Sequence, residues 1–178
     1  PTGIFAHNPE PLKENLTEIA NTVQSQKCDM GIVVDPDVDR LALISENGDM
    51  FGEEYTLVAI ADYYMQVQPG STVSNLSSSR ALRDVTQNGG QEHFASAVGE
   101  VNVVRKMKDV DAVIGGEGNG GIIVPDLHYG RDSLIGIALF LSHYVKQGKS
   151  MSELKASYPS YHMAKNKVQL RAGMVPDE

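Results

Sequence analysis

The 178-residue sequence contains no tryptophan and only one cysteine, and these shortages narrow the classes of protein it can represent. Cys28 has no second cysteine to pair with, so a disulfide-built scaffold is excluded and a reducing compartment, the cytoplasm, is predicted. The longest apolar run, Leu134 to Leu141, is too short to cross a bilayer, and no signal-peptide pattern is present. We therefore expect no membrane contact.

Basic residues are also scarce, since 15 lysines and arginines stand against 23 acidic residues, for a formal net charge of −8. No basic patch with interleaved aromatic residues is present, so nucleic acid is not an expected partner. The hydrophobic fraction of 41% is ordinary for a globular chain. The sequence opens with Pro1-Thr2-Gly3 and no methionine, which suggests a piece of a longer polypeptide.

Short β-branched runs alternate with helical patterns, which favours a layered α/β/α fold with a mixed sheet. Helices are expected near residues 12–23, 53–68, 79–88, 99–108, 132–147 and 151–157, and strands near 30–35, 41–45, 72–76, 93–97, 110–114, 122–124 and 167–171. Residues 1–50 hold too few strands to close a sheet, so we expect a partial domain there and a complete one over residues 51–178.

Three aspartates at alternate positions, Asp35, Asp37 and Asp39, stand between two apolar runs that predict buried strands. In an extended segment the three carboxylates would point to one side, where they repel one another unless a cation lies among them. Oxygen-only, anionic ligands suit Mg²⁺ or Ca²⁺. Arg40 follows directly, and its guanidinium could bind a phosphate group beside the metal. The plainer alternative is a solvated turn.

Two other chemistries share part of this aspartate pattern. An EF-hand requires glycine at the sixth loop position, where this chain has Arg40, and flanking helices that the sequence does not predict, so it is rejected. Haloacid-dehalogenase-like phosphatases also place an Asp-x-Asp pair after a buried strand. A phosphatase that uses Asp35 as nucleophile therefore remains a weaker alternative.

A glycine-rich stretch, Gly115 to Gly121, carries five glycines in seven residues. It contains G-x-G-x-x-G, but a strand is predicted after it rather than a helix, so a dinucleotide site is excluded. No Gly-Lys-Ser/Thr follows, which excludes a P-loop. Glu117 and Asn119 alternate within the stretch and could bind sugar hydroxyls. The alternative is a flexible hairpin tip with two solvated polar residues.

Four stretches, in this order, resemble the α-D-phosphohexomutase superfamily, which covers phosphoglucomutase, phosphomannomutase and phosphoglucosamine mutase. They are Asp35-Pro36-Asp37-Val38-Asp39-Arg40, Ala97-Val98-Gly99-Glu100, Gly116-Glu117-Gly118-Asn119-Gly120 and Gly130-Arg131-Asp132. The common family form has glycine at the position of Val38 and serine at that of Asn119. Ala6-His7-Asn8-Pro9 is similar to the end of the family's catalytic loop, but Ala6 replaces the phosphorylated serine, so His7 is interpreted as structural.

The resemblance implies a fragment that covers part of domain 2 and domain 3 of an enzyme interconverting hexose 1- and 6-phosphates through a phosphoserine and a bisphosphate. It implies Mg²⁺ on Asp35, Asp37 and Asp39, with Arg40 as the catalytic residue. It also implies substrate contacts from a set of loop residues: Gly99, Glu100, Glu117, Gly118 and Asn119. Domains 1 and 4 of the same polypeptide would be its partners, and the isolated chain would be inactive. A non-enzymatic metal- or sugar-binding α/β module is the alternative.

Overall fold

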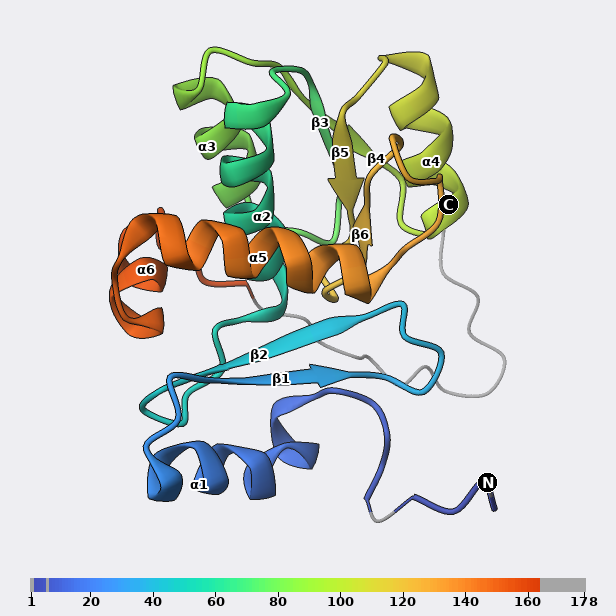
Figure 1. Ribbon diagram of the computed structural model, residues 1–178. Coiled ribbons are helices and arrows are strands. Elements are labelled where there is room, and N and C mark those ends of the chain that lie inside the picture. Colours follow the sequence, from blue (N-terminus) through green and yellow to red (C-terminus); the bar gives the residue numbers. More distant parts are fainter. Residues whose placement is uncertain (1, 6, 164–178) are drawn as a thin grey trace.

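The computed structural model describes residues 2–5 and 7–163 (Figure 1). A 3-10 turn at Lys13–Asn15 precedes the first helix. The helices are α1 (Thr17–Gln26), α2 (Glu53–Val67), α3 (Ala81–Asn88), α4 (Glu100–Asp109), α5 (Ser133–Gln147) and α6 (Met151–Ala156). The strands are β1 (Met30–Val34), β2 (Leu41–Ser45), β3 (Thr72–Asn75), β4 (His93–Ser96), β5 (Ile114–Gly116) and β6 (Ile122–Ile123).

The first part of the chain is an antiparallel hairpin of β1 and β2, in which Val34 lies opposite Leu41. Helix α1 packs on one face of it, through a buried cluster that includes Leu16, Val23 and Ile44. Figure 1 shows the hairpin between α1 and α5. Every residue of β2 is therefore buried, because the strand has protein on both faces.

The prediction that β1 is a buried strand is wrong. Among the described residues β1 pairs only with β2, and only Gly31 on it is buried. Ile32 and Val34 are each 37% exposed. An apolar, β-branched run is typical of strands covered on both faces, and the pattern alone cannot tell whether that cover is supplied within the described chain.

The second part is a four-stranded sheet in the order β4-β3-β5-β6. Strands β4, β3 and β5 run parallel, and β6 is antiparallel to β5, so the sheet is mixed as predicted. Helices α2 and α3 cover one face and α4 covers the other (Figure 1). The layered α/β/α prediction is confirmed.

The largest core joins the two parts. Leu41 and Leu43 from β2 lie in the same buried cluster as Phe51, Ile60 and Phe140. The rings of Phe51 and Phe140 meet edge to face, with 5.2 Å between their centroids. The loop that leaves β1 is therefore fixed against the second sheet through its neighbour β2.

One strand was predicted in the wrong place. Residues 110–113 lie outside the strands, and β5 begins only at Ile114 and continues through Gly115 and Gly116. Asp111 has a φ of 51°, a left-handed conformation that interrupts an extended run. The remaining described elements lie within a few residues of their predicted bounds, except that α1 begins at Thr17 rather than near Leu12. The strand predicted at 167–171 lies outside the described residues.

A polar layer between the sheet and α3 makes stability depend on pH. The ring nitrogens of His93 lie 2.9 Å from Thr72 Oγ1 and 3.3 Å from Ser74 Oγ. Burial, aided by the nearby charge of Arg83, lowers the pKa of His93 to about 4. The folded chain therefore keeps His93 neutral between pH 6.5 and about 4, whereas the unfolded chain takes up a proton there.

We expect the free energy of unfolding to fall by about 1–2 kcal/mol between pH 7 and pH 5 through this histidine. The measurement is urea unfolding of the wild type and His93→Gln at both pH values, because glutamine does not titrate. His7→Gln, which removes an exposed imidazole from another part of the chain, serves as the control substitution. An equally steep decrease in His93→Gln would contradict the assignment.

None of the helices in the described part of the chain is long and apolar enough to cross a membrane.

Candidate functional site

Four loops from separate parts of the chain meet at one edge of the second sheet. Three of them follow the carboxyl ends of the parallel strands β3, β4 and β5, and bring Asn75, Gly99 and Glu117 together. The fourth is the β1–β2 loop, which carries the aspartates. Ligands of open α/β sheets bind outside the carboxyl ends of parallel strands, so this is the edge where a site is expected.

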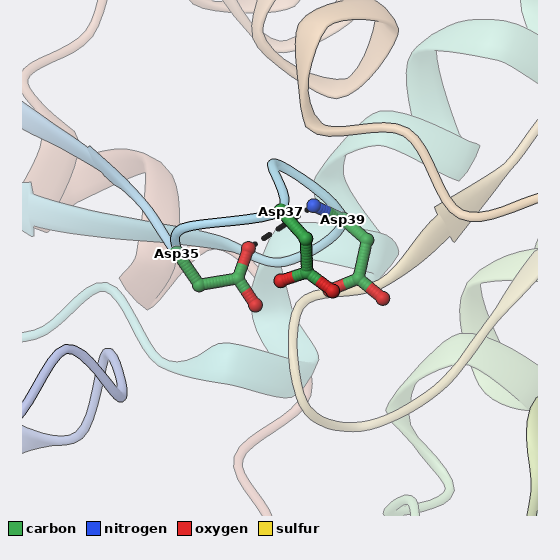
Figure 2. A group of neighbouring side chains, drawn as sticks. All are labelled: Asp35, Asp37 and Asp39. Atoms are coloured by element: carbon green, nitrogen blue, oxygen red, sulfur yellow. Dashed lines mark hydrogen bonds between the residues drawn. The ribbon is translucent and has the colours of Figure 1, made fainter. Parts of the chain in front are cut away.

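The three aspartates of the β1–β2 loop do lie together. Asp35, Asp37 and Asp39 each offer a carboxylate oxygen within 4.8 Å of the others (Figure 2). The predicted reason is wrong, however, because the loop is a turn and not an extended segment. Val38 has a φ of 60°, and its amide donates to the Asp35 carbonyl over 3.1 Å. The turn, rather than strand alternation, gathers the carboxylates.

The Asp35 side chain is buried, and both of its carboxylate oxygens accept hydrogen bonds. Its Oδ1 accepts the backbone amides of Asp39 and Arg40, each at 3.0 Å, and its Oδ2 accepts Arg40 Nε at 2.6 Å. Burial favours the protonated form, but the hydrogen bonds from Arg40 and Asp39 outweigh it and hold the pKa of Asp35 below its usual value. Asp35 is therefore ionised in the folded chain.

Asp39 is under the opposite influence. Burial and the adjacent Asp35 raise its pKa, against the attraction of Arg131. Its Oδ1 is buried and has no hydrogen-bond partner among the described residues, although Arg40 Nε lies 3.7 Å away in an ion pair. A buried carboxylate oxygen without a hydrogen bond, beside two other carboxylates, fits a hard divalent cation, which would satisfy the oxygen and relieve the repulsion.

Val38 is held in a conformation that β-branched residues rarely adopt. Since a left-handed backbone costs a non-glycine residue about 1–3 kcal/mol, and glycine loses about 0.5–1 kcal/mol of chain entropy on folding, we expect Val38→Gly to raise the free energy of unfolding by about 1 kcal/mol. Val34→Gly, in extended β1, is the control and should be destabilising. Both are measured by urea unfolding, and a destabilised Val38→Gly would contradict the argument.

Arg40 forms ion pairs with three carboxylates. Its Nε contacts Asp35 and lies 3.7 Å from Asp39 Oδ1, and its terminal Nη1 donates to Glu10 Oε1 over 3.1 Å. The side chain remains 27% exposed. The guanidinium is thus oriented beside the aspartates with part of its donor edge open to solvent.

The glycine-rich stretch connects β5 to β6, as the predicted strand-to-strand loop. Its backbone touches the β1–β2 hairpin, because Leu41 N donates to Gly120 O over 3.0 Å. A side chain at Gly118 would press on Ser78 Oγ at 3.0 Å, so the loop lies close to the residues after β3. The loop is a packed part of the site and not a solvated hairpin tip.

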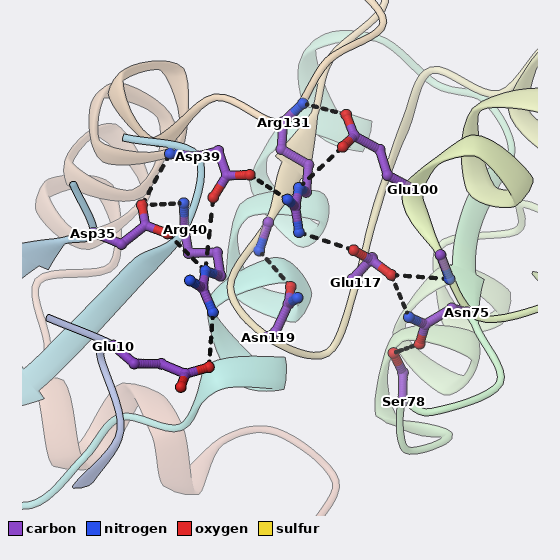
Figure 3. A network of polar contacts seen from close by, with 12 residues as sticks. Glu10, Asp35, Asp39, Arg40, Asn75, Ser78, Glu100, Glu117, Asn119 and Arg131 are labelled. Atoms are coloured by element: carbon purple, nitrogen blue, oxygen red, sulfur yellow. Dashed lines mark hydrogen bonds and ion pairs between the residues drawn. The ribbon is translucent and has the colours of Figure 1, made fainter. Parts of the chain in front are cut away.

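Glu117 is 6% exposed and occupied on both oxygens (Figure 3). Oε1 accepts Asn75 Nδ2 at 2.9 Å and the Gly99 amide at 3.3 Å, and Oε2 accepts Arg131 Nη1 at 3.0 Å. Asn119 instead bonds within its loop, where Oδ1 accepts the Gly121 amide at 3.2 Å. Of the predicted substrate residues, Gly99 and Glu117 are therefore in direct contact, and Glu100 joins them through Arg131.

Sequence reasoning did not assign three residues of this network to the site. Asn75 could have been found from its place at the end of a parallel strand. Glu10 gave no signal, because its contact with Arg40 spans 30 residues. Arg131 lies in one of the four stretches that resemble the family, but its ion pairs with Asp39, Glu100 and Glu117 join distant parts of the chain and have no local sequence signal.

Comparison with known proteins places these features in context. The family model described as phosphoglucomutase/phosphomannomutase, alpha/beta/alpha domain III matches residues 52–161, and the corresponding domain II model matches residues 1–48. A phosphoglucomutase/phosphomannomutase of Thermococcus kodakarensis is 35% identical over 169 residues, which is 94% of this chain and 37% of that protein. A probable phosphoglucosamine mutase of Methanopyrus kandleri is 31% identical, over 99% of this chain and 40% of that protein.

A solved structure agrees in fold. The putative phosphomannomutase from Thermus thermophilus superposes with a TM-score of 0.78 at 24% identity, over 84% of this chain and 35% of that one. The chain thus spans well under half the length of the relatives it matches.

Proposed function

The chain belongs to the α-D-phosphohexomutase superfamily, and from this premise we propose that it supplies the cation-binding and sugar-recognition parts of a mutase that interconverts hexose 1-phosphate and hexose 6-phosphate. The reaction would be an intramolecular phosphoryl transfer, an isomerisation overall, that runs through a phosphoserine and a hexose bisphosphate. We propose residues 1–50 as the domain 2 part and residues 51–178 as domain 3. Domains 1 and 4 of the same polypeptide would supply the phosphoserine and the distal phosphate site.

The three aspartates carry the proposal. Asp35, Asp37 and Asp39 would hold Mg²⁺, which when bound would neutralise phosphoryl charge and polarise phosphorus. The buried Oδ1 of Asp39, which accepts no hydrogen bond among the described residues, is the observation that favours a cation at this place. The open edge of Arg40 would orient the phosphoryl group by charge-assisted hydrogen bonds.

The glycine-rich loop would meet the sugar. Glu117 Oε2 accepts only Arg131 Nη1 and keeps a lone pair, so a hydroxyl proton could be accepted there, whereas Oε1 already accepts two protein donors. Asn119 would offer an amide to the same ring, and Gly99, Glu100 and Gly118 would border it.

The phosphatase alternative is less well supported. A nucleophilic Asp35 needs space for a phosphate ester to approach its carboxylate, but this residue is 2% exposed. A cation needs only one lone pair, and Asp35 Oδ2 keeps one because it accepts a single hydrogen bond.

A chimera tests the proposal. This chain replaces the matching segment of the Thermococcus kodakarensis relative, and conversion of glucose 1-phosphate to glucose 6-phosphate is assayed with Mg²⁺ and a trace of the bisphosphate. We expect activity in the chimera and none in the isolated chain. Because a cation supplies several kcal/mol of charge stabilisation, Asp37→Asn should reduce the rate about 100-fold or more.

The control for that substitution is Asp49→Asn, which removes a carboxylate outside the site and should leave the rate unchanged. A folded chimera that lacks activity but still binds Mn²⁺ would favour the non-enzymatic metal-binding module. The cytoplasmic location stays a prediction.

A further inference from the structure

Arg131 lies among three carboxylates that come from two loops and the first residue of α4 (Figure 3). Its Nη2 contacts Asp39 Oδ2 in the β1–β2 loop. Its Nη1 lies 3.0 Å from Glu117 Oε2 in the glycine-rich loop, and its Nε lies 3.3 Å from Glu100 Oε2 at the start of α4. The side chain is 19% exposed. One guanidinium thus contacts both the loop proposed to bind the cation and the loop proposed to bind the sugar.

The position of this guanidinium is set by its surroundings. The Arg131 amide donates to Glu100 Oε1 over 3.2 Å, and the next residue, Asp132, caps the N-terminus of α5. The stem of Arg131 also crosses Gly121, where an added Cβ would come within 2.4 Å of Arg131 Cδ. The arginine therefore has little freedom to leave the three carboxylates.

The two oxygens of the Asp39 carboxylate have different surroundings. Arg131 occupies Oδ2, whereas Oδ1 is buried without a hydrogen bond among the described residues. In metal sites the ligating carboxylates are themselves hydrogen-bonded by outer partners, which orient them and tune the affinity of the site. Arg131 has this relation to Asp39.

Arg131 contacts Glu117 as well as Asp39, so it does more than orient one proposed cation ligand. The charge of a single guanidinium is shared between a carboxylate of the cation loop and a carboxylate of the sugar loop. When Glu117 is replaced by glutamine, the guanidinium loses its ion pair with that residue and is freer to move onto Asp39, where it competes with an incoming cation for the carboxylate. The hydrogen bond from Leu41 to Gly120 also joins the two loops, but it is between backbone groups and carries no such charge.

We propose that Arg131 is a positioning residue through which the carboxylate of Glu117 affects the affinity of the three aspartates for a divalent cation. The inference rests on the proposed function, since it assumes that the aspartates hold a divalent cation. It adds that the cation and sugar loops communicate through this arginine.

A double-mutant cycle with Mn²⁺, followed by electron paramagnetic resonance, tests the coupling in the 178-residue chain. The dissociation constant is measured for the wild type, Glu117→Gln, Arg131→Met and the double variant. We expect Glu117→Gln to weaken Mn²⁺ binding about five-fold or more when Arg131 is present, and less than about two-fold in the Arg131→Met background.

Two variants act as controls. Glu54→Gln removes a carboxylate that accepts the Ser79 amide and has no contact with Arg131, so it should change the dissociation constant less than about two-fold. Arg131→Lys keeps the charge but replaces the planar fork, whose Nη2 and Nη1 contact Asp39 and Glu117 separately, with a single nitrogen on a flexible stem. The Glu117→Gln effect should be lost in this background too, which preserves the test if Arg131→Met fails to fold.

The outcomes separate the two claims. An equal effect of Glu117→Gln with and without Arg131 would overturn the coupling and leave the proposed function intact. Absence of Mn²⁺ binding in the folded wild-type chain would overturn the proposed cation site, and the coupling with it.

Discussion

Replacing Gly120 by alanine is expected to lower the free energy of unfolding by about 3–5 kcal/mol, because backbone strain and overpacking act together. Gly120 has a φ of 86°, a conformation that L-residues rarely adopt. An added Cβ would lie 2.3 Å from the Leu41 carbonyl oxygen, and that backbone atom begins a strand and cannot move aside. The hydrogen bond from Leu41 N to Gly120 O would be lost at the same time.

Gly90→Ala is the matched control for this substitution. Gly90 has a φ of 74° but no heavy atom within 4 Å of the added Cβ. It isolates the conformational cost, which should be about 1 kcal/mol. Urea unfolding followed by circular dichroism measures both variants. Similar losses in the two would show that the contact between the glycine-rich loop and the hairpin contributes nothing.

Leu41→Ala is expected to lower the free energy of unfolding by about 3 kcal/mol, through lost burial and the cavity left behind. Leu41 is fully buried, and its side chain reaches the core shared by β2, α2 and α5. The Leu41 side chain packs against Gly136 of α5, which has no side chain of its own to fill the gap. Leu134→Ala, at a site 66% exposed, is the control and should change stability by less than about 0.5 kcal/mol.

The single cysteine gives this prediction a second measurement. Cys28 is partly buried and packs against the α1–hairpin cluster. Its labelling by a thiol reagent under native conditions reports opening of the first part of the chain. If the Leu41 side chain joins the hairpin to the second part of the chain, labelling of Cys28 should be about 100-fold faster in Leu41→Ala than in the wild type, in proportion to the lost stability. Unchanged labelling in a destabilised variant would mean that the first part opens independently of the shared core.

Local patterns predicted most of the fold. Helical periodicity located α2 and α5, and β2 has the predicted bounds of Leu41–Ser45. Strand β5 was misplaced because two of its three residues are glycines, which are rare in strands, while the β-branched residues before it occupy a turn. The exposure of Ile32 and Val34 could not be predicted, since it depends on what covers a strand rather than on the strand itself.

The candidate site was predicted in its parts but not in its connections. Alternating carboxylates and isolated polar residues among glycines are visible in a sequence. The ion pair between Asp39 and Arg131 joins residues 92 positions apart, and no local pattern encodes it. The left-handed Val38 was also not predicted, because valine has little tendency to adopt that conformation. Both features arise from the packing of the hairpin onto the second sheet.

Among the described residues, six carboxylates lie near two guanidinium groups at this edge of the sheet (Figures 2 and 3). The carboxylates are those of Glu10, Asp35, Asp37, Asp39, Glu100 and Glu117, and the guanidinium groups are those of Arg40 and Arg131. Such an excess of one sign extends a field into solvent over about 10 Å at 0.1 M salt. It speeds the diffusional approach of cations and slows that of phosphate esters. Added salt weakens both effects, so the order in which the two ions reach this surface is set by ionic strength as well as by affinity.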